Sequence, residues 1–307
     1  MRSKDAESKI SKFYSEYPFP NIPLNKKEDI YQTLIYKLIY GLTRKYLEKN
    51  NKPKILDVGC GTGEADLGLA DGKRSILAID NNIQSIEIAK QRVRKFNKKV
   101  QFKHFNFVKN SLPKNYYDFI YSIGVLHHTS EPEKNFNKLV KSLKVGGYIT
   151  IGIYNPYGSL KVRIRRGILK LLAGDDFEKK IEIYRKIFYR RPLTLQEEVA
   201  VADAFANPYR RYYSFEQLLG WFKRNNIEYL DSAPPLELSK NIKIMYEIIK
   251  NKFFGKRIDL MSIWQKVTYE NPSKKWERSK IIAFLTQLSW VPLGRGELIN
   301  IVGRKTK

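Results

Sequence analysis

The chain has 307 residues, and its 57 Lys and Arg against 31 Asp and Glu give a formal net charge of +26 at pH 7. A single cysteine, Cys60, excludes an internal disulfide, and no apolar stretch reaches the length needed to span a bilayer. The first residues hold no apolar signal-peptide core, which favours a cytoplasmic location. The length suits one large domain that carries insertions.

The positive charge favours anionic partners, such as RNA or an acidic lipid surface. A composition rich in Lys, Asn, Ile and Tyr is typical of AT-rich genomes, so codon supply accounts for part of the lysine surplus. Codon supply does not explain the clustered arginines, which are Arg163, Arg165, Arg166, Arg185, Arg190, Arg191, Arg210 and Arg211. A merely solvated basic surface and an anion-binding surface both stay open, and no obligate protein partner is inferred.

Residues 1–50 are expected to form an N-terminal arm and a helix. The stretch 13–21 is aromatic and contains Pro18 and Pro20, which predicts an extended arm. An amphipathic helix is expected to follow over about 29–48. The arm has two interpretations: a lid over a bound ligand, to which Tyr14 and Tyr17 would contribute, or a segment that packs on the core for stability alone.

Residues 55–64 indicate an apolar strand that ends in alternating glycines. Such glycines admit positive φ and let backbone amides approach a ligand closely. A dinucleotide fingerprint needs a small residue where Glu64 stands, and no Gly-Lys-Ser/Thr follows to make a phosphate loop. The pattern D-x-G-x-G-x-G resembles motif I of the class I S-adenosylmethionine-dependent methyltransferases. The resemblance implies a cofactor loop formed by Asp57, Gly59, Cys60, Gly61, Thr62 and Gly63, with Cys60 as a small apolar filler.

Two further strands carry polar residues that extend this resemblance. Residues 75–80 form the second expected strand, and Asp80 stands where the family's acidic residue accepts hydrogen bonds from both ribose hydroxyls. Capping of the next helix, expected over 82–96, is the alternative role for Asp80. The third strand, 100–106, ends at Asn106 where the family usually has an Asp that receives the adenine amine. The carbonyl of Asn106 is still an acceptor, and Asn81 and Phe107 are assigned to the cofactor beside these residues.

The fourth strand, 117–123, runs into Gly-Val-Leu-His-His-Thr, followed by an expected helix over 134–143, a turn at Gly146 and Gly147, and a fifth strand over 148–154. This order resembles the UbiE/UbiG-like (methyltransferase type 11/12-like) branch of the family. Alternation of strand and helix over 51–155 predicts a cofactor-binding core with a doubly wound, Rossmann-like parallel sheet, whose ligands bind at the carboxyl ends of the strands. Ile123 and Gly124 would then line the cofactor.

His127 and His128 lie at this same edge and are the candidates for a catalytic base, because histidine titrates near neutral pH. The alternative is that one histidine packs under the loop while the other lines the pocket. No metal is implied, because the chain has three histidines and no carboxylate cluster of ligand spacing.

Residues 156–213 are expected to form a helical cap insertion that opens with a basic amphipathic helix. The apolar residues near one face of this helix are Leu160, Ile164, Ile168, Leu171 and Leu172. Three roles stay open for that face: packing on the core, lying on an anionic membrane, or lining a groove for nucleic acid. Peripheral attachment to an anionic membrane is therefore one predicted location.

Residues 214–307 are expected to complete a seven-stranded sheet through strands at 227–231 and 297–304. A helix over 215–225 is predicted from a capping box between Ser214 and Gln217. A second helical insertion, with helices near 237–253 and 276–288, occupies about 232–295.

The expected activity is transfer of a methyl group from S-adenosylmethionine, by in-line displacement, to a small-molecule or lipid-like acceptor. The acceptor atom, O, N or C, stays open. Two alternatives remain: an RNA methyltransferase, favoured by the Arg- and Tyr-rich cap, and a non-catalytic protein that binds S-adenosylmethionine. The candidate substrate contacts are Tyr14, Tyr17, Tyr154, Arg210 and Arg211.

Overall fold

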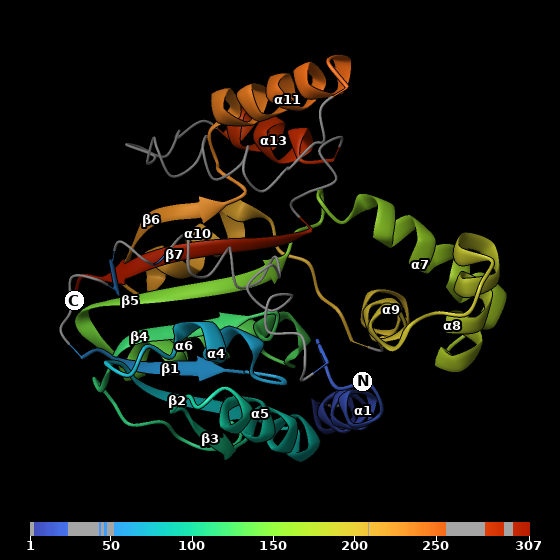
Figure 1. The fold of residues 1–307 in the computed structure, drawn as a ribbon. Helices are drawn as coiled ribbons and strands as arrows, with labels where there is room; N and C mark the ends of the chain where they lie inside the picture. Colours follow the sequence, from blue (N-terminus) through green and yellow to red (C-terminus); the bar gives the residue numbers. More distant parts are fainter. Residues whose placement is uncertain are drawn as a thin grey trace.

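The computed structural model describes residues 3–23, 43, 46–47, 52–207, 209–255, 280–291 and 297–307. Seven strands form one sheet in the order β3-β2-β1-β4-β5-β7-β6 (Figure 1). The strands are β1 (Lys54–Val58), β2 (Ser75–Asp80), β3 (Gln101–His104), β4 (Tyr117–Ile123), β5 (Leu143–Tyr154), β6 (Ile227–Ala233) and β7 (Leu298–Lys305). β1 to β5 are parallel, and β7 runs antiparallel between β5 and β6. The predicted Rossmann-like seven-stranded α/β fold is confirmed.

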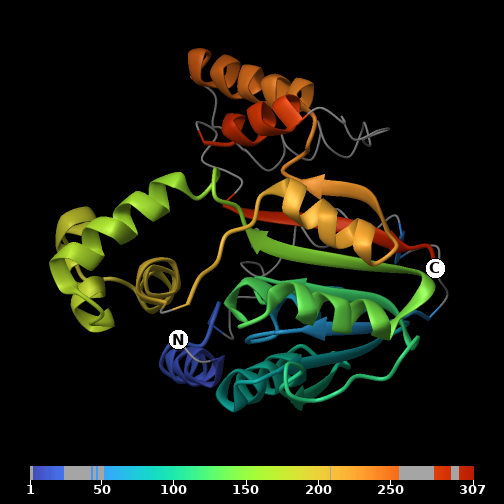
Figure 2. The same cartoon turned by 180° about the vertical axis from the view of Figure 1, so that it is seen from behind.

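Helices cover both faces of the sheet (Figures 1 and 2). They are α4 (Glu64–Leu69), α5 (Ile83–Lys95), α6 (Pro132–Ser142) and α10 (Phe215–Arg224). α6 and α10 contact each other through Phe136 and Phe222, whose stacked ring centroids are 5.6 Å apart. α10 begins with the predicted capping box, in which Ser214 accepts from the Gln217 amide and Gln217 accepts from the Ser214 amide. Apolar residues on both faces of the strands are buried, as a doubly wound sheet requires.

Between β5 and α10 the chain forms a run of helices beyond the carboxyl ends of the strands (Figure 1). They are α7 (Leu160–Ala173), α8 (Phe177–Tyr184), the π-helix η2 (Arg185–Tyr189), α9 (Leu195–Val201) and the π-helix η3 (Ala202–Ala206). The N-terminal helix α1 (Ser3–Glu16) joins them, because Phe13 is buried in one cluster with Leu169, Tyr184 and Phe205. These helices and α1 are called the cap below. Between β6 and β7 lie α11 (Leu238–Phe253) and α13 (Lys280–Ser289).

The structure corrects two predictions about local conformation. The expected extended arm is helical as far as Glu16, and the amide of Tyr17 still donates to the carbonyl of Phe13 over 2.9 Å. Pro18 ends the helix there, because a residue before proline avoids the helical conformation. β5 starts at Leu143, so Gly146 and Gly147 lie inside a strand whose pairing with β4 shifts register, instead of ending a helix.

The predicted apolar face of α7 does not pack on the core. Its members are exposed by 42% (Leu160), 57% (Ile164), 48% (Ile168), 87% (Leu171) and 52% (Leu172). Leu169 and Ala173, on the other side of the helix, are buried instead. The packing interpretation of this face is therefore wrong. The helix predicted over 29–48, apart from residues 43, 46 and 47, and the start of the helix predicted at 276 lie outside the described residues.

Candidate functional site

The glycine loop that follows β1 adopts the conformation that its sequence requires. Gly59, Gly61 and Gly63 have φ of 74°, 55° and 79°. A Cβ on Gly59 would collide with the side chain of Val125, and a Cβ on Gly61 would collide with the carbonyl oxygen of Phe19. The loop therefore needs glycine both for its left-handed backbone and for the close approach of neighbouring segments.

The carboxylate of Asp80 holds this loop against β2. Its Oδ2 accepts from the Gly61 amide at 3.0 Å, and its Oδ1 accepts from the Asn82 amide at 2.8 Å. Burial raises the pKa of Asp80, and the backbone hydrogen bonds counter part of that rise. Each oxygen accepts a hydrogen bond from one of these amides and keeps a further lone pair. The carboxylate therefore fits a ligand with two adjacent hydroxyls.

The remaining predicted cofactor residues surround this loop. The side-chain carbonyl of Asn106 accepts from the amides of Val108 and Lys109 at 3.0 and 3.1 Å, so it shapes a turn and would bind adenine only in addition to that task. Phe107 is buried in the core, and the carbonyl of Asn81 contacts Nε2 of His104. Gly124, next to Ile123, has φ of 79° and no atom within 4 Å of an added Cβ, so open space adjoins the end of β4.

Two carboxylates that belong to this region are buried side by side. Burial raises the pKa of Asp57 to about 7, and the neighbouring Asp66 of α4 counters part of that rise. Burial and the neighbouring Asp57 raise the pKa of Asp66 as well. Two adjacent buried carboxyls favour a state in which at least one is protonated. Sequence reasoning named Asp57 and missed Asp66.

The segment that follows α1 lies on the glycine loop. The carbonyl of Phe19 accepts from the Thr62 amide at 3.3 Å, and the Asn21 amide donates to Thr62 Oγ1 at 3.0 Å. Next to them Arg92 forms a buried ion pair with Glu64 over 2.7 Å and also donates to the carbonyl of Ile22. The N-terminal segment is thus fixed to the cofactor loop by backbone and buried charged contacts.

His128 meets Tyr14 and Asp203 where the cap contacts the sheet. Nδ1 of His128 lies 2.6 Å from the carbonyl oxygen of Tyr209, which only accepts, so Nδ1 carries the proton. Burial lowers the pKa of His128 to about 4, which leaves Nε2 as a free acceptor near neutral pH. Nε2 lies 3.3 Å from the Tyr14 hydroxyl, and that hydroxyl donates to Asp203 Oδ1 at 2.8 Å.

Tyr154, at the end of β5, completes this cluster. Its hydroxyl donates to Asp203 Oδ2 at 3.0 Å, and the Arg210 guanidinium lies 3.3 Å from the centre of its ring. Arg210 also forms an ion pair with Glu297. Burial raises the pKa of Asp203, but His128, Arg210 and the two tyrosine hydroxyls outweigh it, so the net pKa lies below its usual value. We call Tyr14, His128, Tyr154, Asp203 and Arg210 the acceptor cluster.

The other candidates have different surroundings. His127 is fully buried, burial holds its pKa well below the usual value, and its ring packs 4.0 Å from that of Tyr154. Tyr17 packs on Phe177 in the cap, with ring centroids 6.1 Å apart. Arg211 is exposed and lies over the ring of Tyr209. The described contacts therefore do not include Tyr17 or Arg211 in the acceptor cluster, and a substrate role for either stays a prediction.

Sequence reasoning missed Asp203 and Asn207. The side-chain amide of Asn207 donates to the Tyr14 hydroxyl at 3.1 Å. Asp203 and Asn207 therefore both hold that hydroxyl in place. The available signal was an Asp inside the apolar run Val-Ala-Asp-Ala-Phe-Ala, since an acidic residue on a buried helix needs partners. η3, which carries Asp203, is a π-helix, and such turns often occur at functional sites.

Several of the clustered arginines have structural partners within the protein. Arg166 donates to the carbonyls of Ala204 and Asn207 at 2.9 and 2.8 Å. Arg191 pairs with Glu197, and Arg165 lies over the ring of Phe188. Some of the clustered arginines therefore stabilise the cap. Their clustering in the sequence is weaker support for nucleic-acid binding than the sequence alone indicated.

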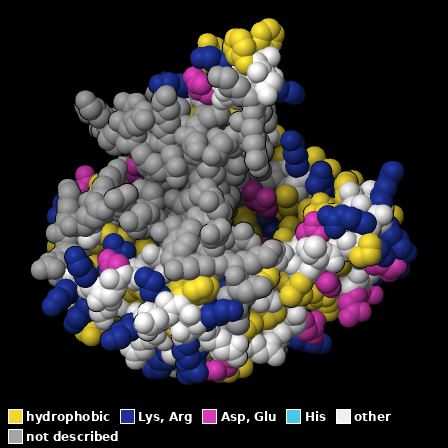
Figure 3. Space-filling model, viewed as in Figure 1, with side chains coloured by type: hydrophobic (Ala, Val, Ile, Leu, Met, Phe, Trp, Pro, Cys, Tyr) yellow, Lys and Arg dark blue, Asp and Glu magenta, His cyan; other side chains and the backbone are white. Residues whose placement is uncertain are grey.

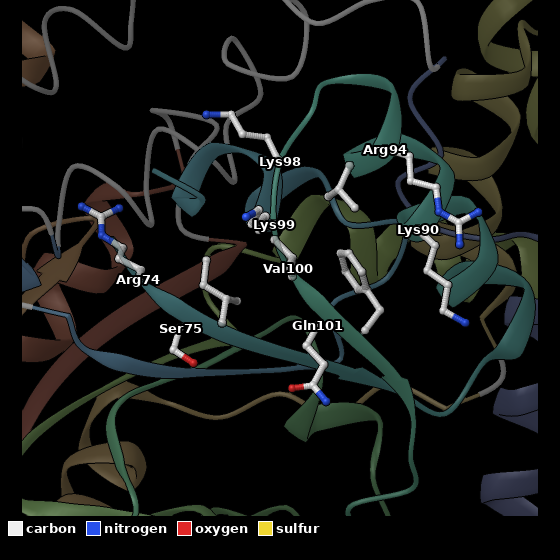
Figure 4. A pocket seen from close by; sticks show the side chains of 11 residues that line it. Arg74, Ser75, Lys90, Arg94, Lys98, Lys99, Val100 and Gln101 are labelled. Atoms are coloured by element: carbon white, nitrogen blue, oxygen red, sulfur yellow. The ribbon is translucent and has the colours of Figure 1, made fainter. Parts of the chain in front are cut away.

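A separate basic cleft of about 540 Å³ lies beside the first residues of β2 and β3, at the other end of the strands (Figure 4). The cations in its walls are Arg74, Lys90, Arg94, Lys98 and Lys99. Arg74 pairs with Asp71 and Lys90 with Glu87, and the labelled cations in Figure 4 spread apart instead of pointing toward one another. This cleft is not part of the site at the carboxyl ends of the strands.

No group of three or more His, Cys, Asp or Glu residues in the described part could hold a metal ion. In that same part of the chain, no helix has the length and apolar character needed to cross a membrane.

Residues 56–151, which include the glycine loop, Asp80 and both histidines, match the family model of the methyltransferase domain. The chain is a class I S-adenosylmethionine-dependent methyltransferase. Its cofactor is S-adenosylmethionine, and the predicted UbiE/UbiG-like branch is compatible with the relatives found. Asp80 and the open space beside Gly124 fit such a cofactor on geometric grounds.

Relatives of this methyltransferase act on different acceptors. It is 33% identical to phosphoethanolamine N-methyltransferase 1 of Arabidopsis thaliana over 36% of this chain, a match that spans 24% of that relative. It is 24% identical to the ubiquinone biosynthesis O-methyltransferase of Nitrosomonas europaea over 63% of this chain and 81% of the relative. A Haemonchus contortus phosphoethanolamine N-methyltransferase 2 structure has a TM-score of 0.53 and 13% identity, covering 97% of this chain and 60% of that one. That likeness shows the fold.

Proposed function

We propose that this methyltransferase acts on a small-molecule or lipid-like acceptor that binds between the cofactor loop and the cap, and that His128 receives the acceptor's proton. One observation carries the proposal. A neutral imidazole with its free Nε2 turned toward a buried tyrosine hydroxyl lies at the edge of the sheet where the cofactor loop lies.

Each group has a role in moving the proton that the acceptor loses. S-adenosylmethionine supplies an electrophilic methyl group on a sulfonium, and a lone pair of the acceptor forms the new bond to carbon while the sulfur keeps the electrons of the broken bond. The acceptor's O–H or N–H proton then passes to Nε2 of His128 directly, or the Tyr14 hydroxyl takes it while its own proton turns from Asp203 to Nε2. Asp203 orients that hydroxyl by accepting its hydrogen bond.

The cluster favours an acceptor with a polar, proton-bearing atom over an acidic carbon. Burial raises the pKa values of Tyr14 and Tyr154 well above their usual range, so both phenols stay protonated and serve as hydrogen-bond donors. The buried carboxylate of Asp203 accepts from both and so fixes their positions. The names of the relatives cover N-, O- and C-methyltransferases, so the preference for an O- or N-acceptor rests on the cluster alone.

The test is formation of S-adenosylhomocysteine by purified protein with cell extract separated into lipid, RNA, protein and small-metabolite fractions. We expect turnover with the lipid or small-metabolite fraction. Turnover with RNA alone would contradict the proposed acceptor, and absence of turnover with every fraction, despite cofactor binding in calorimetry, would support the non-catalytic alternative. Steeply salt-dependent RNA binding would revive the RNA alternative.

A further inference from the structure

Helix α7 has one side that is fixed to the cap. Leu169 and Ala173 on this side are buried, and Arg166 donates to the carbonyls of Ala204 and Asn207. These contacts attach the helix to η3, the turn that carries Asp203. The rotation of α7 about its own axis is therefore set by its buried side.

The outward side of α7 is apolar. Residues spaced by three, four or seven positions fall on one stripe of a helix, and five large apolar side chains do so here. They are Leu160, Ile164, Ile168, Leu171 and Leu172, with 42% to 87% of each side chain exposed. Phe188 of η2, which is 46% exposed, continues the stripe because the guanidinium of Arg165 lies 4.7 Å from its ring. Monomeric proteins rarely leave so long an apolar patch in water.

Cations border the stripe on both sides. At 100° per residue, Arg163 and Lys170 fall on one border and Arg165 on the other. Lys161 falls within the stripe, between Ile168 and Leu172. The helix has no Asp or Glu between Leu160 and Ala173; Asp175 and Asp176 follow after its end. Figure 3 shows yellow apolar and dark blue basic side chains together on the right of the molecule, where Figure 1 places α7 and α8, with acidic side chains lower on that side.

We propose that α7 is an interfacial helix that lies on an anionic lipid bilayer, with its apolar stripe below the headgroups and its cations at the phosphates. The pattern satisfies both requirements of such a helix, apolar area and basic borders. A second copy of this chain would bring a charge of +26 against +26, and RNA would offer phosphates without an apolar phase for the stripe. The anionic bilayer complements both features.

Attachment through α7 would place the cap next to the membrane, with η3 and its Asp203 on the inner side of the same helix. This inference needs only the surface of α7, so it does not depend on which acceptor is methylated. A failure to bind lipid would leave the proposed chemistry of His128 intact, and a failure of that chemistry would leave lipid binding intact.

The first experiment is co-sedimentation of the full chain with vesicles of phosphatidylcholine, with and without phosphatidylglycerol. We expect binding to the anionic vesicles that weakens as salt rises, and little binding to the neutral ones. The double variant Leu171→Ser/Leu172→Ser and the charge variant Lys161→Glu/Lys170→Glu should each lose about tenfold or more in vesicle affinity. The matched control is Val145→Ser, which removes another exposed apolar side chain, 62% exposed on β5, and should bind as the parent does.

A second experiment measures insertion directly. Cys60 is the chain's one cysteine and it is buried, so a thiol dye can report on Leu171→Cys, with Val145→Cys as the control. We expect a blue shift of the dye at position 171 when anionic vesicles are added, and none at 145. Unchanged circular dichroism and thermal unfolding would show that the variants fold.

Three results would overturn the proposal. One is undiminished vesicle binding by the Leu171→Ser/Leu172→Ser variant. Another is a dye at position 171 that stays in water while the protein binds. The third is concentration-dependent self-association of the parent in sedimentation velocity that the same double variant abolishes, which would make the stripe an interface between copies.

Discussion

The cofactor loop and the acceptor cluster are built in opposite ways. The loop is one continuous stretch, and its main contacts use backbone atoms: Gly59, Gly61 and Gly63 turn the chain, and Asp80 accepts from the Gly61 amide. The acceptor cluster uses side chains from distant parts of the sequence, and Tyr14 and Asp203 are 189 positions apart. Under the proposed function, a local backbone turn would hold the cofactor, whereas side chains that only the folded cap brings together would select the acceptor.

If the two regions have separate tasks, substitutions at His128 should affect chemistry and spare cofactor binding. His128→Ala and Tyr14→Phe should lower turnover by about 10²- to 10⁴-fold, because each interrupts the path of the acceptor's proton. Single-turnover formation of S-adenosylhomocysteine gives the rate, and calorimetry gives the cofactor affinity, which should stay within about twofold. The control, Tyr184→Phe, removes a cap hydroxyl whose partner is Arg165. Equal losses in binding and rate would show that the regions are not separable.

Arg210 connects the cluster to the sheet, so its removal should cost stability as well as activity. Arg210→Met removes the guanidinium that pairs with Glu297 and helps to lower the pKa of the buried Asp203, and the free energy of unfolding should fall by about 1–3 kcal/mol. Urea unfolding measures this. Arg191→Met, at the exposed pair with Glu197, should leave the unfolding midpoint unchanged. If the urea-unfolding midpoint of Arg210→Met equals that of the parent, the fold does not depend on this contact for its stability.

The backbone role of the loop can be tested at Gly61. Gly61→Ala requires a side chain at φ of 55° and against the Phe19 carbonyl, which should cost about 1–3 kcal/mol of unfolding free energy and weaken S-adenosylmethionine binding. Gly167→Ala is the control, because Gly167 lies within α7 with no atom within 4 Å of an added Cβ. That change should stabilise by about 0.5–1 kcal/mol. Calorimetry that finds normal cofactor affinity in Gly61→Ala would argue against the assigned loop.

A smaller effect is expected from the buried carboxyl pair. The pKa of Asp57 is about 7 in the folded chain, above its ordinary value, so its protonated form is favoured and stability is lost as pH rises from about 4 through 7. Asp66→Asn removes the neighbouring carboxyl and should reduce the loss of unfolding free energy between about pH 5 and about pH 8 by on the order of 1–2 kcal/mol. His128, whose pKa is lowered to about 4, destabilises as pH falls, but equally in both proteins. Parallel pH profiles would contradict the coupling.

The fold and the conformation of the glycine loop could be predicted because local patterns determine them. Apolar strands, glycine spacing and the Ser214 capping box act over a few residues, and the structure forms them as expected. The same local reasoning failed at α1, where the aromatic run before Pro18 is helical because Phe13 can be buried against the cap. Proline determined where the helix ends and did not determine what precedes it.

The cap could be predicted only as a set of helices. The period of α7 showed that an apolar stripe exists, but which side docks depends on Arg166 and Leu169 meeting η3, a contact that no local pattern contains. Asp203 could not be predicted for the same reason, because its partners Tyr14 and Tyr154 lie 189 and 49 positions before it in the sequence. Asn106 was predicted to bind adenine, but the sequence did not reveal that its side-chain carbonyl also accepts from the Val108 amide and supports a turn.

The N-terminal segment described above touches both ligand regions. Tyr14 of α1 belongs to the acceptor cluster, and a few residues later Phe19 and Asn21 bond to the cofactor loop. If both ligands bind as proposed, release of spent cofactor and release of methylated product would require displacement of the same short stretch of chain. The rate at which residues 3–22 detach would limit both departures, so exchange of the two ligands should be kinetically coupled even though the sites that recognise them are built separately.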